Sequence, residues 1–179
     1  PALEAPPGRR LPAGRRARPV SPDVLRRAYD AGAAQYDARF TDQQRPKIEA
    51  LLARTPRWTP ALDLGCGTGL AQRITGRPFI RLDFSRGMLA QGGGPRVQAD
   101  AARMPFADAT FVLVLSVTAL IDFTDPRPQV AEVRRVLQTG GCLALSVLKH
   151  ERIKALTEGL GQAGFQIVER LDLKEDWGF

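Results

Sequence analysis

The chain has 179 residues, 44% of them hydrophobic, and carries a formal net charge of +7. This length and composition predict a single domain with its own hydrophobic core. No apolar run approaches the ~20 residues of a membrane-spanning helix, and no hydrophobic secretory segment follows the first residue, so neither class of protein is expected.

The positive charge is concentrated at the beginning of the chain. Residues 1–20 carry a net charge of +4 from five arginines and one glutamate, and the remainder carries +3. This segment is rich in proline, arginine, alanine and glycine and has few large apolar side chains, so we expect a flexible tail. Two interpretations stay open: a solvated leader without a fixed role, or an arm that binds nucleic acid or another anionic surface.

Residues 21–55 are predicted to be helical. Ser21 followed by Pro22 is typical of a helix start, and a further helix is expected over residues 45–55, with three apolar residues on one face. Between them the sequence repeats Tyr-Asp after seven residues, as Tyr29-Asp30 and Tyr36-Asp37. One interpretation of this repeat is that its two aromatic residues pack the helix onto the body of the domain.

The most informative stretch covers residues 61–69. A short apolar run containing Asp63 leads into a loop with glycines at positions 65, 67 and 69, and helical spacing follows. A strand, a tight loop and a helix in this order direct backbone N–H groups at a ligand. The spacing differs from the G-x-G-x-x-G pattern of dinucleotide-binding proteins, because the third glycine comes one residue early.

Two more acidic residues end the next two predicted strands. Asp83 closes a strand over residues 79–84, and Asp100 closes one over residues 96–100. A carboxylate at the end of the second strand can accept hydrogen bonds from both hydroxyls of a ribose. Ser85, a predicted N-cap, then opens a helix that carries Met88.

The remaining pattern completes a doubly wound α/β fold. Residues 111–117 form an apolar run typical of a central parallel strand, and Ser116 lies near its ligand-binding end. A strand over 140–147, a helix over 151–164 and a strand over 165–173 follow, and a final antiparallel strand would begin near residue 176, where it is incomplete if present. We therefore expect three layers, α/β/α, around a mostly parallel sheet in one domain over residues 21–179.

These motifs resemble those of the class I S-adenosylmethionine-dependent methyltransferases of the ubiquinone and menaquinone biosynthesis type. The Tyr-Asp leader, the Asp-x-Gly-x-Gly-x-Gly loop, the run from Asp83 to Leu89 and the block from Asp125 to Gly141 match in order, whereas Val112 stands where the family has Asp. The resemblance implies that S-adenosylmethionine binds the chain and that the helices over residues 21–55 form a lid over it, which is the alternative role for the two aromatic residues of the leader. The cofactor-binding residues expected from the motifs are Tyr36, Asp63, Gly65, Cys66, Gly67, Asp83, Phe84, Met88, Asp100, Ala101 and Ser116.

In the family, the glycine loop and the first Asp face the methionine part of the cofactor, the second Asp the ribose, and the third the adenine. We therefore predict methyl transfer to a small-molecule acceptor by direct displacement. An RNA or protein acceptor that uses the basic tail, and a non-catalytic cofactor-binding subunit, are the alternatives. No catalytic base is assigned, because the single histidine, His150, is expected in an exposed loop.

The two cysteines predict a reducing compartment. Cys66 is expected beyond the end of one strand and Cys142 near the beginning of another, which are opposite edges of a parallel sheet. They would lie too far apart for a disulfide, so a cytoplasmic location is predicted. No Cys or His spacing indicates a metal site.

Overall fold

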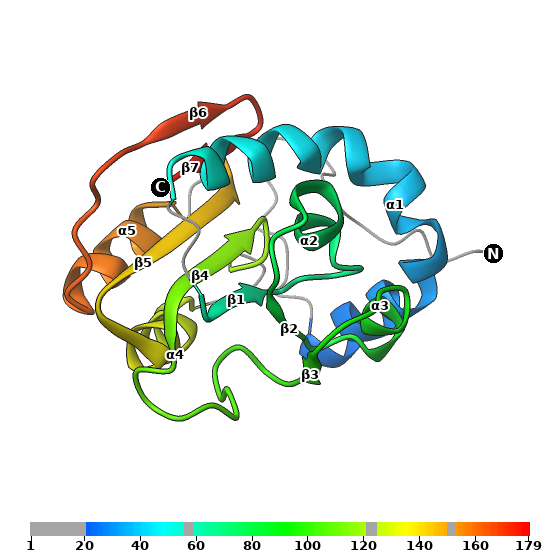
Figure 1. Ribbon diagram of the computed structural model, residues 1–179, viewed down its shortest axis with the longest axis horizontal. Coiled ribbons are helices and arrows are strands. Elements are labelled where there is room, and N and C mark those ends of the chain that lie inside the picture. The colour runs from blue at the N-terminus through cyan, green and yellow to red at the C-terminus, as the bar shows by residue number, and fades with distance from the viewer. Residues whose placement is uncertain (1–20, 56–58, 121–124, 150–152) are drawn as a thin grey trace.

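The computed structural model of the chain describes residues 21–55, 59–120, 125–149 and 153–179 (Figure 1). Seven strands form one sheet in the order β3-β2-β1-β4-β5-β7-β6. The strands are β1 (Ala61–Leu64), β2 (Ile80–Asp83), β3 (Arg96–Gln98), β4 (Phe111–Val117), β5 (Leu137–Leu148), β6 (Leu171–Leu173) and β7 (Asp176–Gly178). The helices are α1 (Pro22–Ala53), α2 (Leu70–Thr75), α3 (Arg86–Ala90), α4 (Arg127–Val136) and α5 (Ile153–Gln162).

The chain order of the strands creates the point where a ligand can bind. Strands β1 to β5 pair in parallel, and the chain winds outward from β1 to β3 before it crosses back to β4. The carboxyl ends of β1 and β4 therefore lie side by side at the position where the winding direction reverses. Such a reversal opens a crevice in doubly wound sheets.

Alternating side chains divide the core into two layers. Leu113 and Leu115 of β4 pack with α1 and α2 on one face of the sheet. Leu62, Leu82 and Val114 pack on the other face, where residues of α4 contribute. The buried side chains of α4 and α5 meet β5 in a third cluster on that same face. The predicted three-layer doubly wound fold is confirmed.

Helix α1 differs from the two helices that the sequence indicates for residues 21–55. It is one continuous helix of 32 residues with Pro46 inside it. Figure 1 shows α1 running from α3 past α2 toward the side of the sheet where β5 and β7 lie. Burial of Ile48, Leu51 and Leu52 against the sheet holds the segment after the proline in place, so tertiary packing overrides the helix-breaking tendency of Pro46.

The sixth strand is shorter than predicted, and the final antiparallel strand is present. Strand β6 covers only Leu171–Leu173 of the predicted 165–173, and β7 is a three-residue strand that pairs antiparallel with both β5 and β6. Both cysteines are free. Cys142 pairs in register with Leu113 of β4, which in turn pairs with Ala61 at the start of β1. Cys66 lies in the loop after the end of β1. The predicted placement of the two cysteines at opposite edges of the sheet is therefore confirmed.

Candidate functional site

The glycine loop closes tightly against the neighbouring strand. Gly65 and Gly67 adopt φ values of +69° and +53°, a region that residues with a Cβ rarely enter. The Gly65 and Cys66 N–H groups both donate to the Leu82 carbonyl, at 2.8 and 3.0 Å. A Cβ at position 65 would lie 2.3 Å from the Cβ of Ala119, in the turn after β4. The loop and this turn therefore approach each other only because residue 65 is glycine.

Asp83 holds the loop from β2. Its Oδ2 accepts the Gly67 N–H at 2.8 Å, and its Oδ1 accepts the Ser85 N–H at the same distance. Burial raises the pKa of Asp83, and these backbone hydrogen bonds oppose that rise by stabilising the carboxylate. The carboxyl group thus lies between the glycine loop and the start of α3, with lone pairs left for a ligand.

Asp63 is the more deeply buried carboxyl group of the site. It is 3% exposed, and its Oδ2 has no hydrogen-bond partner among the residues that the structure describes. Burial and the nearby Asp83 raise its pKa to about 7, although Arg81 opposes the shift. A buried polar atom without a partner costs free energy unless a ligand or a water satisfies it.

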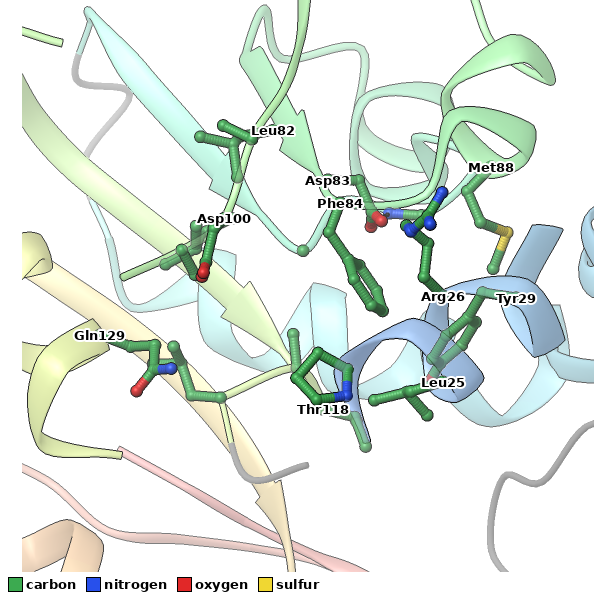
Figure 2. A pocket seen from close by; sticks show the side chains of 18 of the residues that line it. Leu25, Arg26, Tyr29, Leu82, Asp83, Phe84, Met88, Asp100, Thr118 and Gln129 are labelled. Carbon is green, nitrogen blue, oxygen red and sulfur yellow. Dashed lines mark hydrogen bonds between the residues drawn. The ribbon is translucent and has the colours of Figure 1, made fainter. Parts of the chain in front are cut away.

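A cavity of about 310 Å³ opens beside the loop at the carboxyl ends of the strands. Eight of the predicted cofactor-binding residues line it: Tyr36, Gly65, Gly67, Asp83, Phe84, Met88, Asp100 and Ala101. Figure 2 shows the Phe84 ring projecting into it between Asp83 and Tyr29, with Asp100 and Gln129 on the opposite side of the view. This volume falls within the range of small-molecule and cofactor sites, which begins at roughly 300 Å³.

The other three predicted residues lie outside this cavity. Asp63 and Cys66 line a smaller cavity of about 30 Å³, which shares the walls formed by Tyr36, Gly65 and Gly67. Ser116 lines neither of the two. Its hydroxyl is fully buried inside β4 and lacks a hydrogen-bond partner within the described part of the chain. At this end of β4 the cavity wall is formed by the residues that follow, from Val117 to Leu120.

Helix α1 covers the cavity and is held there by two aspartates that the sequence analysis did not assign. Asp30 accepts hydrogen bonds from the Ser85 hydroxyl at 2.6 Å and the Gly87 N–H at 2.8 Å, at the start of α3. Asp37 accepts from the Thr68 hydroxyl and also pairs with Arg73 of α2. The sequence did contain a signal for these two contacts. The Tyr-Asp pair repeats after seven residues, and this spacing places both carboxylates on one face of a helix.

The aromatic residues of the same repeat lie on the cavity side. The Tyr29 ring packs edge-on against Phe84, with centroids 5.8 Å apart, and Tyr36 packs against Phe40. Leu25 and Arg26, one helical turn earlier, also line the cavity and were missed from the sequence. In Figure 2 the side chain of Arg26 extends from α1 in the direction of Asp83.

Thr118 forms the far wall and was also missed. It lies in the turn after β4 with a φ of +56°, an uncommon backbone conformation for a β-branched residue. Its hydroxyl donates to Asp176 at 2.8 Å and accepts from Lys47 at 3.3 Å. Lys47 and Asp176 form a buried ion pair at 2.8 Å. These partners lie 71 and 58 residues away from Thr118, so no local pattern could have shown them.

Several expectations fall on other parts of the chain. The basic tail at residues 1–20 and His150 lie outside the described residues. Within the described ranges, no group of three or more His, Cys, Asp or Glu side chains is placed to hold a metal ion. No helix in that part of the chain combines the length and hydrophobicity that crossing a membrane requires.

The chain is similar in sequence to known methyltransferases. Residues 62–145 match a family described as a methyltransferase domain, Methyltransf_11. A malonyl-[acyl-carrier protein] O-methyltransferase of Enterobacter lignolyticus is 33% identical over 150 residues, which are 78% of this chain and 59% of the relative. A demethylmenaquinone methyltransferase of Renibacterium salmoninarum is 34% identical over 97 residues, covering 50% of this chain and 41% of the relative.

A solved structure shares the fold. A chain from the complex between the Haloferax volcanii Trm112 methyltransferase activator and a methyltransferase superposes with a TM-score of 0.72 at 23% identity, over 82% of this chain and 80% of that one. The present chain spans about three fifths of the length of the malonyl-[acyl-carrier protein] relative. By its matched domain, its motifs and its sheet order, the chain belongs to the class I S-adenosylmethionine-dependent methyltransferases.

Proposed function

We propose that the chain transfers a methyl group from S-adenosylmethionine to a small acceptor that lies in the cavity beneath α1. The observation that carries this proposal is one cavity in which Asp83, Asp100 and the glycine loop face a wall formed mostly by apolar side chains. Polar groups that converge on an apolar pocket are typical of a site for a small molecule.

The residues present fit the cofactor group by group. The unpartnered Oδ2 of Asp63 would accept a hydrogen bond from the ammonium group of the cofactor. Asp83 would accept from the ribose hydroxyls, and Asp100 from the adenine amino group. Asp100 Oδ1 already accepts the Ala102 N–H at 2.8 Å, which leaves its other oxygen for the ligand. The Ala101 N–H would serve a ring nitrogen of the adenine.

Apolar side chains would hold the adenine and exclude water. Phe84 and Met88 line the cavity beside Asp83, and Leu120 lies in the turn after β4. Tyr29 supports the Phe84 ring from α1. When bound, S-adenosylmethionine supplies an activated methyl group on a sulfonium. The task of the protein is then to align the acceptor and to keep water out of the cavity.

We infer that the acceptor carries a carboxylate. A carboxylate is ionised at neutral pH, so no residue has to remove a proton from it. This matches a cavity for which we assign no catalytic base, and whose wall includes the cation of Arg26. The malonyl-[acyl-carrier protein] O-methyltransferase relatives support the same choice. Binding of nucleic acid through residues 1–20 stays a prediction from the sequence.

Calorimetry with S-adenosylhomocysteine, the product form of the cofactor, tests the proposal. We expect binding to the unmodified chain and a loss of affinity of about tenfold or more for Asp83→Asn, because a hydrogen bond to a charged group contributes ~1.5–3 kcal/mol. Asp108→Asn is the matched control, since Asp108 is exposed and pairs with Arg135 away from the cavity. Absence of binding at millimolar ligand would contradict the proposal.

Turnover distinguishes the enzyme from a non-catalytic subunit. Labelled S-adenosylmethionine is incubated with the chain and a panel that contains a malonyl thioester, a hydroquinone and a primary amine. We expect label on the malonyl thioester. Retained cofactor binding without transfer to any acceptor would support the non-catalytic interpretation, and transfer to the amine alone would overturn the inferred carboxylate.

A further inference from the structure

A buried arginine lies beneath the glycine loop and takes no part in the contacts described so far. Arg81, in β2, is 1% exposed and has the largest of the fully buried side chains. Its Nη1 approaches the Thr68 carbonyl at 3.4 Å, while Nε and Nη2 have no partner among the described residues. Burying an unpaired charge is costly, so a position of this kind calls for a physical reason.

Two glycines make room for this guanidinium group. A Cβ at Gly69, in the loop, or at Gly92, after α3, would lie 2.4 Å from Nη1 of Arg81. Backbone on both sides therefore forms the enclosure, and any larger residue at either position would displace the arginine. The side chain occupies a space fitted to it.

The charged neighbours of Arg81 are the two carboxyl groups of the site and the exposed Arg96, its register partner in β3. Asp63 and Arg81 are direct partners in the β1–β2 register, and Asp83 follows Arg81 by two residues, so all three side chains point to the same face of the sheet. No carboxylate of the described chain lies within the 4.0 Å of an ion pair with Arg81. The guanidinium therefore acts on Asp63 through space, without a direct contact.

The other elements around Asp63 bring no competing charge. From β4 its register partner is Leu115, and from α1 the shared small cavity is lined by Tyr36 and Gln44. The Cys66 thiol lies in the loop, and its pKa is raised by burial and by the two aspartates. Arg73 of α2 is occupied by Asp37.

We propose that Arg81 is a positioning residue for the cofactor: its buried positive charge favours the ionised form of Asp63, so that Asp63 can accept a hydrogen bond from the ammonium group of the ligand. This inference rests on the proposed function for its ligand, but its electrostatic part concerns residues of this chain alone.

The pKa of Asp63 agrees with this role. Burial and Asp83 raise it to about 7, and Arg81 lowers it. About half of the Asp63 side chains are therefore ionised near pH 7, and the ionised fraction increases about tenfold between about pH 6 and about pH 8. If only the ionised form binds the ammonium group, the affinity for S-adenosylhomocysteine rises by about the same factor over that range.

The experiment compares Arg81→Lys with Arg81→Gln, two variants that differ in charge. Asp63 is followed in the ligand-free protein by carbon NMR of labelled aspartate carboxyl groups, with its resonance assigned through Asp63→Asn. We expect Arg81→Lys to titrate close to the unmodified chain and Arg81→Gln to titrate about one pH unit higher, as expected on removal of a nearby opposite charge. Equal midpoints for the two variants would overturn the proposal.

Calorimetry with S-adenosylhomocysteine adds a binding readout. For Arg81→Gln we expect affinity about fivefold weaker near pH 7 and within about 1.5-fold of the unmodified chain near pH 8.5, because Asp63 is ionised there in both. Arg77→Gln is the control, since Arg77 hydrogen-bonds the carbonyls of Leu52 and Thr55. Loss of the Arg77 guanidinium should lower the free energy of unfolding without moving the midpoint of the Asp63 titration.

The remaining outcomes are also decisive. If Arg81→Gln folds only in acid, where both aspartates are protonated, the charge-balance account is supported. If Arg81→Gln folds neither in acid nor near neutral pH, Arg81 has a packing role and the proposal is wrong. Failure of S-adenosylhomocysteine to bind the unmodified chain at any pH would remove the proposed function, whereas the NMR titration would still test the influence of Arg81 on Asp63.

Discussion

Lys47→Met should destabilise the chain strongly because it leaves a buried carboxylate without its counter-ion. The side chains of Lys47 and Asp176 are 8% and 0% exposed, and their charged atoms lie 2.8 Å apart. Without the ammonium group, the Asp176 carboxylate keeps, among the residues that the structure describes, only the hydrogen bond from Thr118. Breaking one partner of a buried ion pair costs about 3–5 kcal/mol, and we expect that loss in the free energy of unfolding.

Chemical denaturation followed by far-ultraviolet circular dichroism measures this loss. Lys154→Met is the matched control, because Lys154 forms a 3.8 Å pair with Glu158 on the surface, with side chains 85% and 59% exposed. An exposed pair of this kind contributes at most about 1 kcal/mol. Trp177 adjoins Asp176 in β7, so its fluorescence, measured in a Trp58→Phe background, reports whether this strand separates first.

The double variant Lys47→Met with Asp176→Leu identifies the cause. It removes both charges and fills the space with apolar atoms, so it should recover most of the lost stability. If Lys47→Met costs no more than Lys154→Met, or if the double variant is as unstable as the single one, the unpaired carboxylate is not the reason and this reasoning is refuted.

Two more predictions concern the site itself. Gly65→Ala should abolish most binding of S-adenosylhomocysteine in calorimetry, because the added methyl would lie 2.3 Å from a side chain in the turn after β4; Gly93→Ala, where a methyl meets nothing within 4 Å, should bind normally, and equal affinities would contradict the steric argument. Asp30→Ala removes the acceptor of the Ser85 hydroxyl and should cost about 1 kcal/mol of stability and weaken ligand binding. Asp108→Ala is its control, and a loss in both variants of the same size would argue against a specific role for Asp30.

Much of the lining of the candidate site could be predicted because its signals are local. The glycine loop, Asp83 and Asp100 follow individual strands, and parallel strands bring their carboxyl ends to one edge of the sheet. The ends of three strands therefore predict that these residues lie close together, and no long-range contact has to be known. Asp63 fits the same rule but faces the smaller cavity, because alternation along β1 directs it to the face that α1 covers.

The parts that could not be predicted depend on distant residues. Thr118, rather than Ser116, reaches the cavity, because β4 keeps Ser116 inside the sheet and the turn begins only after Val117. The Lys47–Asp176 pair joins residues 129 apart, and the burial of Arg81 depends on glycines in two separate loops. The continuity of α1 across Pro46 likewise follows from packing on the sheet, which propensity does not contain.

A crystal structure of the chain with S-adenosylhomocysteine bound tests the central claim most directly. The account predicts the ribose hydroxyls on Asp83, the adenine edge on Asp100 and the ammonium group on Asp63, with α1 covering the ligand. A ligand bound outside the cavity, or one inside it that leaves all three carboxylates without contact, would contradict the account.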